Sequence, residues 1–296
     1  MDILLPLVIA LTAAIGAAAP TRPHAGYTLR FNVAYRTPSR GIFTGNLYQP
    51  TAKSTRARPA LLVLHGGGWA DGSDYSTGVR FLSRRLAQAG YVVFNINYRL
   101  NRQRGYFPRD IRDVKNALAF MDRNARAWNI NPHRVALVGA SAGAHLVLMA
   151  AYTPNSGGFA IRQRFVKPAA VVGYYTPTDL TQIEHLRGPM RPLVLRLVKG
   201  YLHPPHGRLT LALLKKASPI SYVKTAVPTM LVQGLGDNLV PPAQAFELAR
   251  KLKARRIPVQ VVKIPGVGHA FNDWRDAARR QALQQVETFL AHRLRH

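Results

Sequence analysis

The feature that most constrains this chain is a serine in a Gly-x-Ser-x-Gly turn between an apolar run and a helix-prone run. The turn reads Gly139-Ala140-Ser141-Ala142-Gly143, after the apolar residues 135–138 and before the helix-prone residues 144–151. A strand–turn–helix of this kind holds the serine in strained backbone geometry and exposes its hydroxyl at the end of the strand. The flanking positions need glycine or alanine because any larger side chain would collide with the neighbouring strand and helix.

A second glycine-rich turn lies upstream, in His65-Gly66-Gly67-Gly68-Trp69, directly after the apolar run 60–64. Two such turns at strand ends can supply a nucleophile and the donors that stabilise an oxyanion. We predict that the backbone N–H groups of Gly67 and Gly68, together with that of Ala142, form this oxyanion hole. A glycine loop could instead cradle a phosphate, but the sequence contains no Gly-x-Gly-x-x-Gly and no Gly-Lys-Ser/Thr motif.

Short apolar runs alternate with segments of helical periodicity along most of the chain. The predicted strands are 60–65, 92–97, 135–138, 169–174, 229–233 and 259–264, and the predicted helices are 77–89, 109–124, 142–151, 243–252 and 273–294. This alternation is typical of a parallel sheet covered by helices on both faces. Residues 27–34 and 45–49 alternate apolar and polar side chains, which predicts an antiparallel hairpin at the sheet edge. We expect one α/β domain over residues 27–296 with a mostly parallel central sheet.

Residues 181–216 interrupt this rhythm with arginines and lysines set among leucines and valines. A long insertion between two sheet strands is usually functional, and we predict a small cap or lid over the site. The alternative is a pair of amphipathic helices on the surface, which the pattern favours equally.

The predicted base is His269. A serine hydroxyl needs a base to remove its proton and a third group to orient that base. His269 lies in the glycine-flexed loop 265–269, right after the last predicted strand, and it follows Ser141 and Asp237 in the chain order Ser, Asp, His of this architecture. His145, just after the nucleophile turn, is expected to be buried against the sheet instead.

The predicted acid is Asp237. It lies in the turn Gly234-Leu235-Gly236-Asp237-Asn238 directly after a predicted strand, at the edge of the sheet where ligands bind. Asp179 also follows a strand and is the reserve candidate. Asp273 and Asp276 are expected to serve the N-terminal turn of the last helix.

Composition narrows the chemistry further. The 296 residues contain no cysteine, which excludes disulfides and a cysteine nucleophile, and no His, Asp and Glu group has metal-ligand spacing. We predict no metal and no cofactor. The net charge of +28 favours anionic polymers, lipid surfaces or substrates. Since the arginines are spread out and no nucleic-acid-binding motif accompanies them, we expect a solvated basic surface without specific nucleic-acid binding; the alternative is loose association with an anionic cell envelope.

The N-terminus predicts a targeting segment. Residues 3–19 are almost entirely apolar and end in three alanines, which favours a signal peptide over residues 1–19 and a secreted or periplasmic location. Asp2 and Pro20 are atypical of such a segment. The alternative is an N-terminal membrane anchor, although the run is short for a full span.

Several short motifs are spread along the chain from Ala60 to Phe271. They are residues 65–69, 97–99, 107–108 with Asp110 and Asp113, 131–135, 139–145, 178–180, 218–219, 236–237 and 268–269. In these motifs the chain resembles an α/β-hydrolase of the esterase/lipase group, near the hormone-sensitive-lipase-like and bacterial feruloyl- or acetyl-esterase-like carboxylesterases. It differs from the hormone-sensitive-lipase pattern at Ala140, where an acidic residue is common.

This resemblance implies a Ser141, Asp237 and His269 triad and hydrolysis of a small-molecule carboxylic ester through an acyl-enzyme intermediate. Arylformamidases and prenylcysteine methylesterases carry similar motifs, so amide or methyl-ester hydrolysis is an alternative. A rival from another class is a non-catalytic binding protein of this fold, but such proteins usually lack one residue of the triad.

Overall fold

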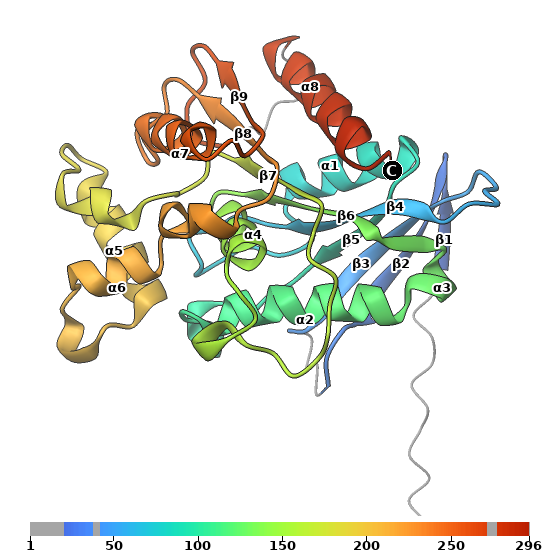
Figure 1. Cartoon of the computed structure of the whole chain (residues 1–296), viewed down its shortest axis with the longest axis horizontal. Helices are drawn as coiled ribbons and strands as arrows, with labels where there is room; N and C mark the ends of the chain where they lie inside the picture. Colours follow the sequence, from blue (N-terminus) through green and yellow to red (C-terminus); the bar gives the residue numbers. More distant parts are fainter. Residues whose placement is uncertain (1–20, 38–41, 271–276, 296) are drawn as a thin grey trace, which may run out of the picture.

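The chain folds around one central sheet with helices on both faces (Figure 1). The computed structural model describes residues 21–37, 42–270 and 277–295. The strands are β1 (Thr21–His24), β2 (Tyr27–Ala34), β3 (Thr44–Pro50), β4 (Arg58–Leu64), β5 (Val92–Ile96), β6 (Ile130–Ala140), β7 (Ala170–Tyr174), β8 (Thr229–Gly234) and β9 (Val259–Ile264).

The α-helices are α1 (Thr77–Gln88), α2 (Arg109–Arg123), α3 (Ala125–Trp128), α4 (Ala142–Tyr152), α5 (Arg191–Leu202), α6 (Leu211–Lys216), α7 (Ala243–Ala254) and α8 (Ala277–Arg293). Short 3-10 helices are η1 (Asn101–Gln103), η2 (Gly157–Phe159), η3 (Leu180–Glu184), η4 (Pro205–Gly207) and η5 (Pro219–Thr225).

The strand order is β1-β2-β3-β5-β4-β6-β7-β8-β9. The pairs β1-β2, β2-β3 and β3-β5 are antiparallel. The pairs β5-β4, β4-β6, β6-β7, β7-β8 and β8-β9 are parallel. The predicted mostly parallel sheet is therefore confirmed. Because the parallel strands run the same way, their carboxyl ends meet at one edge, where ligands of such sheets bind.

Each face of the sheet has its own hydrophobic core. Successive side chains of a strand point to opposite faces, so Leu62 and Leu64 of β4 join one core while Leu61 and Val63 join the other. Helices α2, α4 and α7 contribute to the first core, and α1 and α8 to the second (Figure 1). The two-sided burial explains why the central strands read as continuous apolar runs.

Three details differ from the sequence prediction. The hairpin of β2 and β3 is not at the edge of the sheet, because β1 pairs outside it with β2. Strand β1 has only four residues and is largely exposed, so it carries no apolar alternation to detect. Strand β6 begins five residues earlier than predicted, at Ile130, and a register shift against β4 accommodates this extension.

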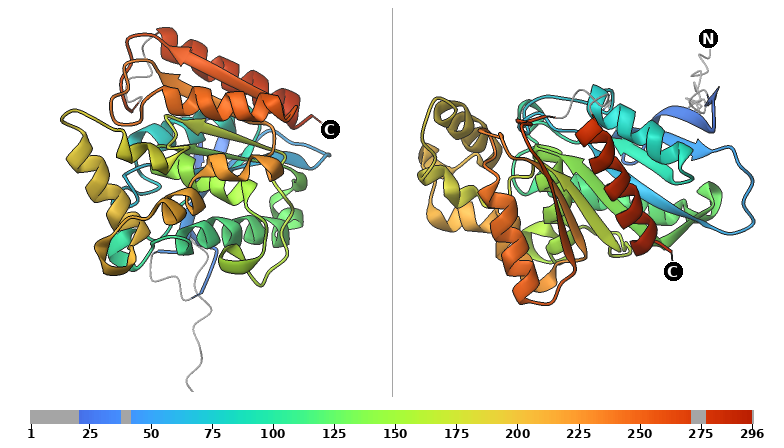
Figure 2. Two further views of the ribbon diagram at one scale, coloured as in Figure 1. Left: turned by 60° about the vertical axis from the view of Figure 1, so that its left-hand side comes forward. Right: turned by 90° about the horizontal axis from the view of Figure 1, so that it is seen from above.

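The segment predicted as a cap holds η3, α5, η4 and α6, which project beyond the carboxyl end of the sheet (Figure 2). This segment lines the pocket described below with Ile183, Leu186, Val194, Leu197 and Val198, and Leu180, just before it, lines the pocket too. That this segment is a cap or lid over the site stays a prediction.

The predicted signal segment 1–19, and Asp273 and Asp276, lie outside the described residues. Among the described helices, none has both the length and the apolar character needed to cross a bilayer.

Candidate active site

Ser141 sits at a sharp turn between β6 and α4 in an unusual backbone conformation. Its φ of 52° and ψ of −120° lie in a region that side-chain-bearing residues rarely adopt. The backbone N–H of Ser141 donates to the Tyr174 carbonyl at 2.9 Å, and the Ser141 carbonyl accepts from the N–H of His145 at 3.0 Å. These bonds fix the turn, so the hydroxyl is held out at the carboxyl edge of the sheet.

The glycines on either side of the serine are required by close backbone contacts. A Cβ on Gly139 would lie 2.5 Å from the Gly143 carbonyl oxygen. A Cβ on Gly143 would lie 2.7 Å from the Leu64 carbonyl oxygen and closer still to that of His65. Helix α4 therefore starts in direct contact with the end of β4, which brings the serine turn and the upstream glycine turn together.

Gly143→Ala is expected to lower the free energy of unfolding by about 3 kcal/mol, because the new methyl group meets backbone atoms that cannot rotate away. Gly78→Ala is the matched control: it lies in α1 with open space around its Cβ position, and we expect it to raise stability by up to about 1 kcal/mol. Urea denaturation measures both. Equal stability of the two variants would contradict the close packing at Gly143.

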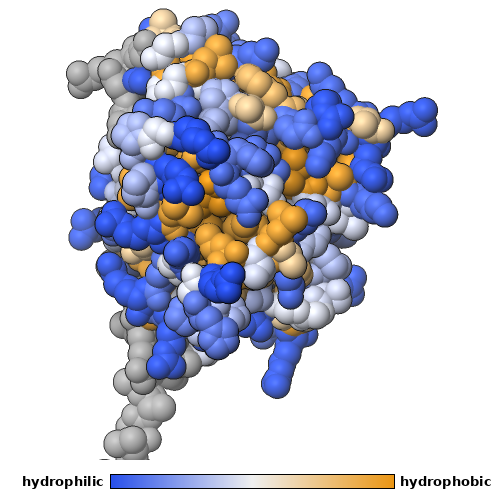
Figure 3. Space-filling view, turned by 90° about the vertical axis from the view of Figure 1, so that its left-hand side faces the viewer, coloured by the Kyte–Doolittle hydropathy of each residue, from blue (hydrophilic) through white to orange (hydrophobic). Residues whose placement is uncertain are grey.

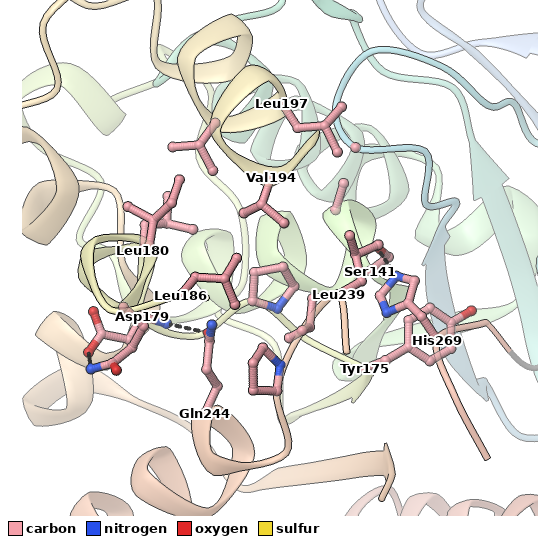
Figure 4. Close-up of a pocket in the computed structure, with 18 of the residues that line it drawn as sticks. Ser141, Tyr175, Asp179, Leu180, Leu186, Val194, Leu197, Leu239, Gln244 and His269 are labelled. Carbon is pink, nitrogen blue, oxygen red and sulfur yellow. Dashed lines mark hydrogen bonds between the residues drawn. The ribbon is translucent and has the colours of Figure 1, made fainter. Parts of the chain in front are cut away.

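The structure brings Ser141, His269 and Asp237 into one hydrogen-bonded line. Ser141 Oγ lies 3.0 Å from His269 Nε2, and His269 Nδ1 lies 2.8 Å from Asp237 Oδ2 (Figure 4 shows Ser141 and His269). An ionised carboxylate only accepts, so Nδ1 carries the proton and Nε2 is free to accept the serine proton. This is the arrangement that activates a serine hydroxyl.

Asp237 is buried and firmly oriented. Its Oδ1 accepts the backbone N–H groups of Leu239 at 3.0 Å and Val240 at 2.9 Å, and Gln233 Nε2 donates to its Oδ2 at 3.2 Å. The turn after β8 therefore holds the carboxylate in place while its Oδ2 faces the histidine.

The reserve acid Asp179 has other partners. Its Oδ1 accepts from the backbone N–H and the hydroxyl of Thr181, at 3.0 and 2.6 Å, which starts the short helix η3. Its own N–H donates to Gln244 Oε1 at 3.0 Å, at the far end of the pocket from Ser141 (Figure 4). Asp179 is thus part of the pocket wall and not of the hydrogen-bonded line.

Residues 66–69, here called the glycine loop, lie beside the serine turn. A Cβ on Gly66 would be 3.2 Å from the Ser141 Cβ, and one on Gly68 would be 2.8 Å from a methyl group of Leu197. Gly67 and Gly68 have positive φ angles, which favour glycine. Gly67, Gly68 and Ala142 all line the pocket next to Ser141. All three residues thus lie beside the nucleophile, and the oxyanion hole formed by their backbone amides stays a prediction.

Buried aromatic and polar contacts hold the residues that precede the glycine loop. The His65 ring stacks on Tyr98, with centroids 4.4 Å apart, and the Tyr98 hydroxyl donates to the His65 carbonyl at 3.0 Å. Arg99 next to it forms a two-pronged ion pair with the buried Asp113, at 2.7 and 2.8 Å. Tyr98 thus packs against the residue that precedes the glycine loop, and the ion pair of Arg99 with Asp113 holds the segment that carries Tyr98.

The pocket in front of Ser141 has a volume of about 1000 Å³. Its walls are mainly apolar and come from the cap segment and the turn after β8 (Figure 4 labels Leu180, Leu186, Val194, Leu197 and Leu239). On the face formed by α5, α6 and α7, hydrophobic side chains gather at the centre and hydrophilic ones surround them (Figure 3). The site can therefore take up a sizeable apolar group next to the serine.

The sequence did not predict one neighbour of His269, the side chain of Tyr175. Tyr175 follows β7 directly, has a φ of 40°, and packs edge-on against the His269 ring with centroids 4.7 Å apart. Nothing in the sequence distinguishes Tyr175 from the apolar strand residues before it.

Across residues 21–37, 42–270 and 277–295, no cluster of three or more His, Asp or Glu side chains has metal-binding geometry.

His145 is fully buried, as expected, but it faces the glycine loop and the cap segment. Its Nε2 donates to the Ala217 carbonyl at 2.7 Å, and its ring meets Trp69 and Tyr201 edge-on. Burial lowers the pKa of His145 to about 4, below the usual 6.5. His145 is therefore neutral at physiological pH.

We expect His145 to make the protein less stable as the pH falls from about 6.5 to about 4. The unfolded chain binds the proton first over this range, so the free energy of unfolding decreases, by up to about 3 kcal/mol for this residue. Above pH 6.5 its contribution is complete. Urea denaturation at several pH values should give a shallower dependence for His145→Gln than for the wild type.

The matched control for this experiment is His133→Gln at an exposed position, which should keep the wild-type slope. Burial raises the pKa of Asp74 to about 6, which has the opposite effect on stability, but this contribution is common to all three proteins and cancels. Parallel curves for the wild type and His145→Gln would contradict the prediction.

Comparison with known proteins identifies the family of this chain and several relatives. The family model BD-FAE matches residues 46–252. LipM of Mycobacterium tuberculosis, named "Probable carboxylic ester hydrolase", is 30% identical over 82% of this chain and 56% of its own length. Esterase LipQ of the same organism is 30% identical over 90% of this chain and 63% of its own length. The chain thus spans less than two thirds of these curated relatives.

Among solved structures, a truncated carbohydrate esterase from gut microbiota superposes with a TM-score of 0.77 at 23% identity, covering 94% of this chain and 100% of that one. The predicted α/β-hydrolase fold is thereby confirmed.

Proposed function

We propose that this chain, which belongs to the BD-FAE family, hydrolyses carboxylic esters of small molecules through an acyl-enzyme formed on Ser141. One observation carries the proposal: the hydrogen-bonded line of Ser141, His269 and Asp237 ends at an apolar pocket. A fold alone does not imply an activity, so this geometry is the main support. The names of the relatives LipM and LipQ point the same way.

In the first half of the reaction, Ser141 Oγ attacks the ester carbonyl while its proton passes to His269 Nε2. Asp237 stabilises the imidazolium that forms. The carbonyl oxygen becomes an oxyanion that accepts hydrogen bonds from the backbone amides of Gly67, Gly68 and Ala142. When the tetrahedral intermediate collapses, the bond to the alkoxy oxygen breaks, and His269 returns the proton to the leaving alcohol.

In the second half, water replaces the alcohol. His269 removes a proton from the water as its oxygen attacks the acyl carbon, and the same amides stabilise the second oxyanion. Collapse of this intermediate breaks the bond to Ser141 Oγ, which regains its proton from His269. The products are a carboxylic acid and an alcohol, and no cofactor is consumed.

The pocket favours an ester with one sizeable apolar part. Its volume of about 1000 Å³ is at the upper end for small-molecule sites, and its walls are mainly apolar. We therefore expect KM to fall from p-nitrophenyl acetate to p-nitrophenyl hexanoate as more methylene groups leave water.

The test combines turnover with covalent labelling. The wild type is assayed on the p-nitrophenyl ester series, and a fluorophosphonate is used to label the active serine, whose position is found by peptide mass mapping. We expect ester turnover and one label on Ser141. Turnover of N-formyl anilides or methyl esters in place of p-nitrophenyl esters would favour the alternative activities. Neither turnover nor label would favour a non-catalytic binding protein.

A further inference from the structure

Three consecutive residues of the glycine loop have left-handed backbone conformations, with φ angles of +114° at Gly67, +59° at Gly68 and +60° at Trp69. Glycine adopts such angles freely, but a bulky residue does so only where its surroundings compensate. Trp69 is next to the two amides assigned to the oxyanion hole. Contacts that hold Trp69 therefore also hold those amides.

The Trp69 ring is buried between two other rings. Tyr201 stacks on it, with centroids 4.5 Å apart and planes 13° apart, and His145 meets it edge-on at 5.2 Å. His145 and Tyr201 also meet edge-on at 5.2 Å. We call these three residues the aromatic cluster. The Trp69 carbonyl accepts one hydrogen bond, from the N–H of Asn101 at 3.0 Å, so the cluster holds the side chain and this bond holds the backbone.

Helix α5 contacts the glycine loop at two successive residues. Tyr201 packs on Trp69, and Leu197, four residues earlier on the same helix face, fills the space where a Gly68 side chain would be. The same helix contributes Val194 and Leu197 to the pocket wall (Figure 4). One helix of the cap segment thus packs on both the substrate pocket and the glycine loop.

His145 connects this contact to the nucleophile. It lies on α4 four residues after Ser141, and its Nε2 donates to the carbonyl of Ala217, just after α6. The aromatic cluster therefore joins the glycine loop, the nucleophile helix and both helices of the cap segment.

We propose that Tyr201 is a positioning residue that holds the oxyanion-hole amides of Gly67 and Gly68 in place by packing on Trp69. The inference rests on the ester hydrolysis proposed above. Tyr201 is fully buried and is not among the residues that line the pocket, so it acts through Trp69 and His145 and not by touching the substrate.

A loss of this packing should affect kcat much more than KM. The oxyanion donors bind the negative charge that develops in the transition state, and they contribute little to binding of the neutral ester. Removing one such donor outright lowers kcat by about 100- to 1000-fold in a well-studied protease. A displaced loop should lose part of that effect.

The activity test compares Tyr201→Leu, Tyr201→Phe and Arg196→Ala on p-nitrophenyl butyrate. For Tyr201→Leu we expect kcat to fall by about 10- to 100-fold with KM within about threefold of the wild type. Tyr201→Phe should stay within about twofold, because among the described residues the Tyr201 hydroxyl has no hydrogen-bond partner. Arg196→Ala, on the exposed side of α5, should not change either constant. A raised KM with unchanged kcat would overturn the proposal.

A second readout does not depend on turnover. Hydrogen exchange followed by mass spectrometry should show faster exchange of amides 66–72 in Tyr201→Leu and unchanged exchange in Tyr201→Phe, with β8 as the internal reference. This result supports the positioning role even if the wild type hydrolyses no ester, whereas unchanged exchange of the loop overturns it. If Tyr201→Leu does not fold, Tyr201→Met, whose unbranched and flexible side chain can adapt to the space left by the ring, carries the same expectations.

Discussion

Replacing Ser141 with alanine is expected to lower kcat for p-nitrophenyl esters by about 10,000-fold or more. Without the hydroxyl, His269 has no proton to remove and no acyl-enzyme forms, so only the oxyanion donors and substrate binding remain. Steady-state assays measure the loss, and fluorophosphonate labelling should disappear with it. Ser221→Ala is the control: Ser221 is an exposed serine in η5, and its replacement should keep full activity.

The unusual backbone at Ser141 allows a sharper version of this experiment. Because φ is 52° and ψ is −120°, alanine inherits the strain of the serine while glycine relieves it. Ser141→Gly should therefore be as inactive as Ser141→Ala but more stable by about 1 kcal/mol. Residual activity of either variant near the wild-type level would refute the role of Ser141 as nucleophile.

The fold was predictable where the sequence pattern reflects burial on both faces of the sheet. The strands around Leu62 and Val138 are continuous apolar runs because both of their faces are covered. The turns at Gly67 and Ser141 were predictable because close backbone packing and positive φ angles demand glycine or small residues. These local requirements leave a direct trace in the sequence.

Features that depend on distant partners were not predictable. The ring of Tyr201 meets Trp69 across more than a hundred residues, and neither residue differs in pattern from an ordinary core position. Strand β1 is largely exposed, and it forms because its backbone pairs with that of β2. Such contacts are decided by packing in three dimensions and not by periodicity.

The sequence alone also could not decide between the two candidates for the acid of the triad. Asp179 and Asp237 both follow strands whose carboxyl ends reach the same edge of the sheet, so chain order left both open. In the structure the two carboxylates have different hydrogen-bond partners. Asp179 Oδ1 accepts from the backbone N–H and the hydroxyl of Thr181, whereas Asp237 Oδ2 lies 2.8 Å from His269 Nδ1. A catalytic role for either carboxylate can be tested by removing its charge while keeping its shape.

Asp237→Asn is expected to lower kcat by about 10,000-fold. The backbone N–H groups of Leu239 and Val240 need an acceptor, so the amide oxygen of the new asparagine should face them. Its NH2 group then faces His269 Nδ1, which must become an acceptor, and the histidine proton moves to Nε2. In that tautomer Nε2 cannot accept the proton of Ser141, although the geometry of the site is preserved.

Asp179→Asn is the matched control for this change. Its amide oxygen can still accept from Thr181, so η3 should keep its start, and we expect kcat within about threefold of the wild type. Steady-state kinetics on p-nitrophenyl butyrate measure both variants, and the histidine tautomer can be read from the nitrogen chemical shifts of His269. A large loss in Asp179→Asn with activity retained in Asp237→Asn would exchange the roles of the two carboxylates. The expected result assigns to Asp237 the role of keeping the proton on Nδ1 of His269, in addition to stabilising the imidazolium.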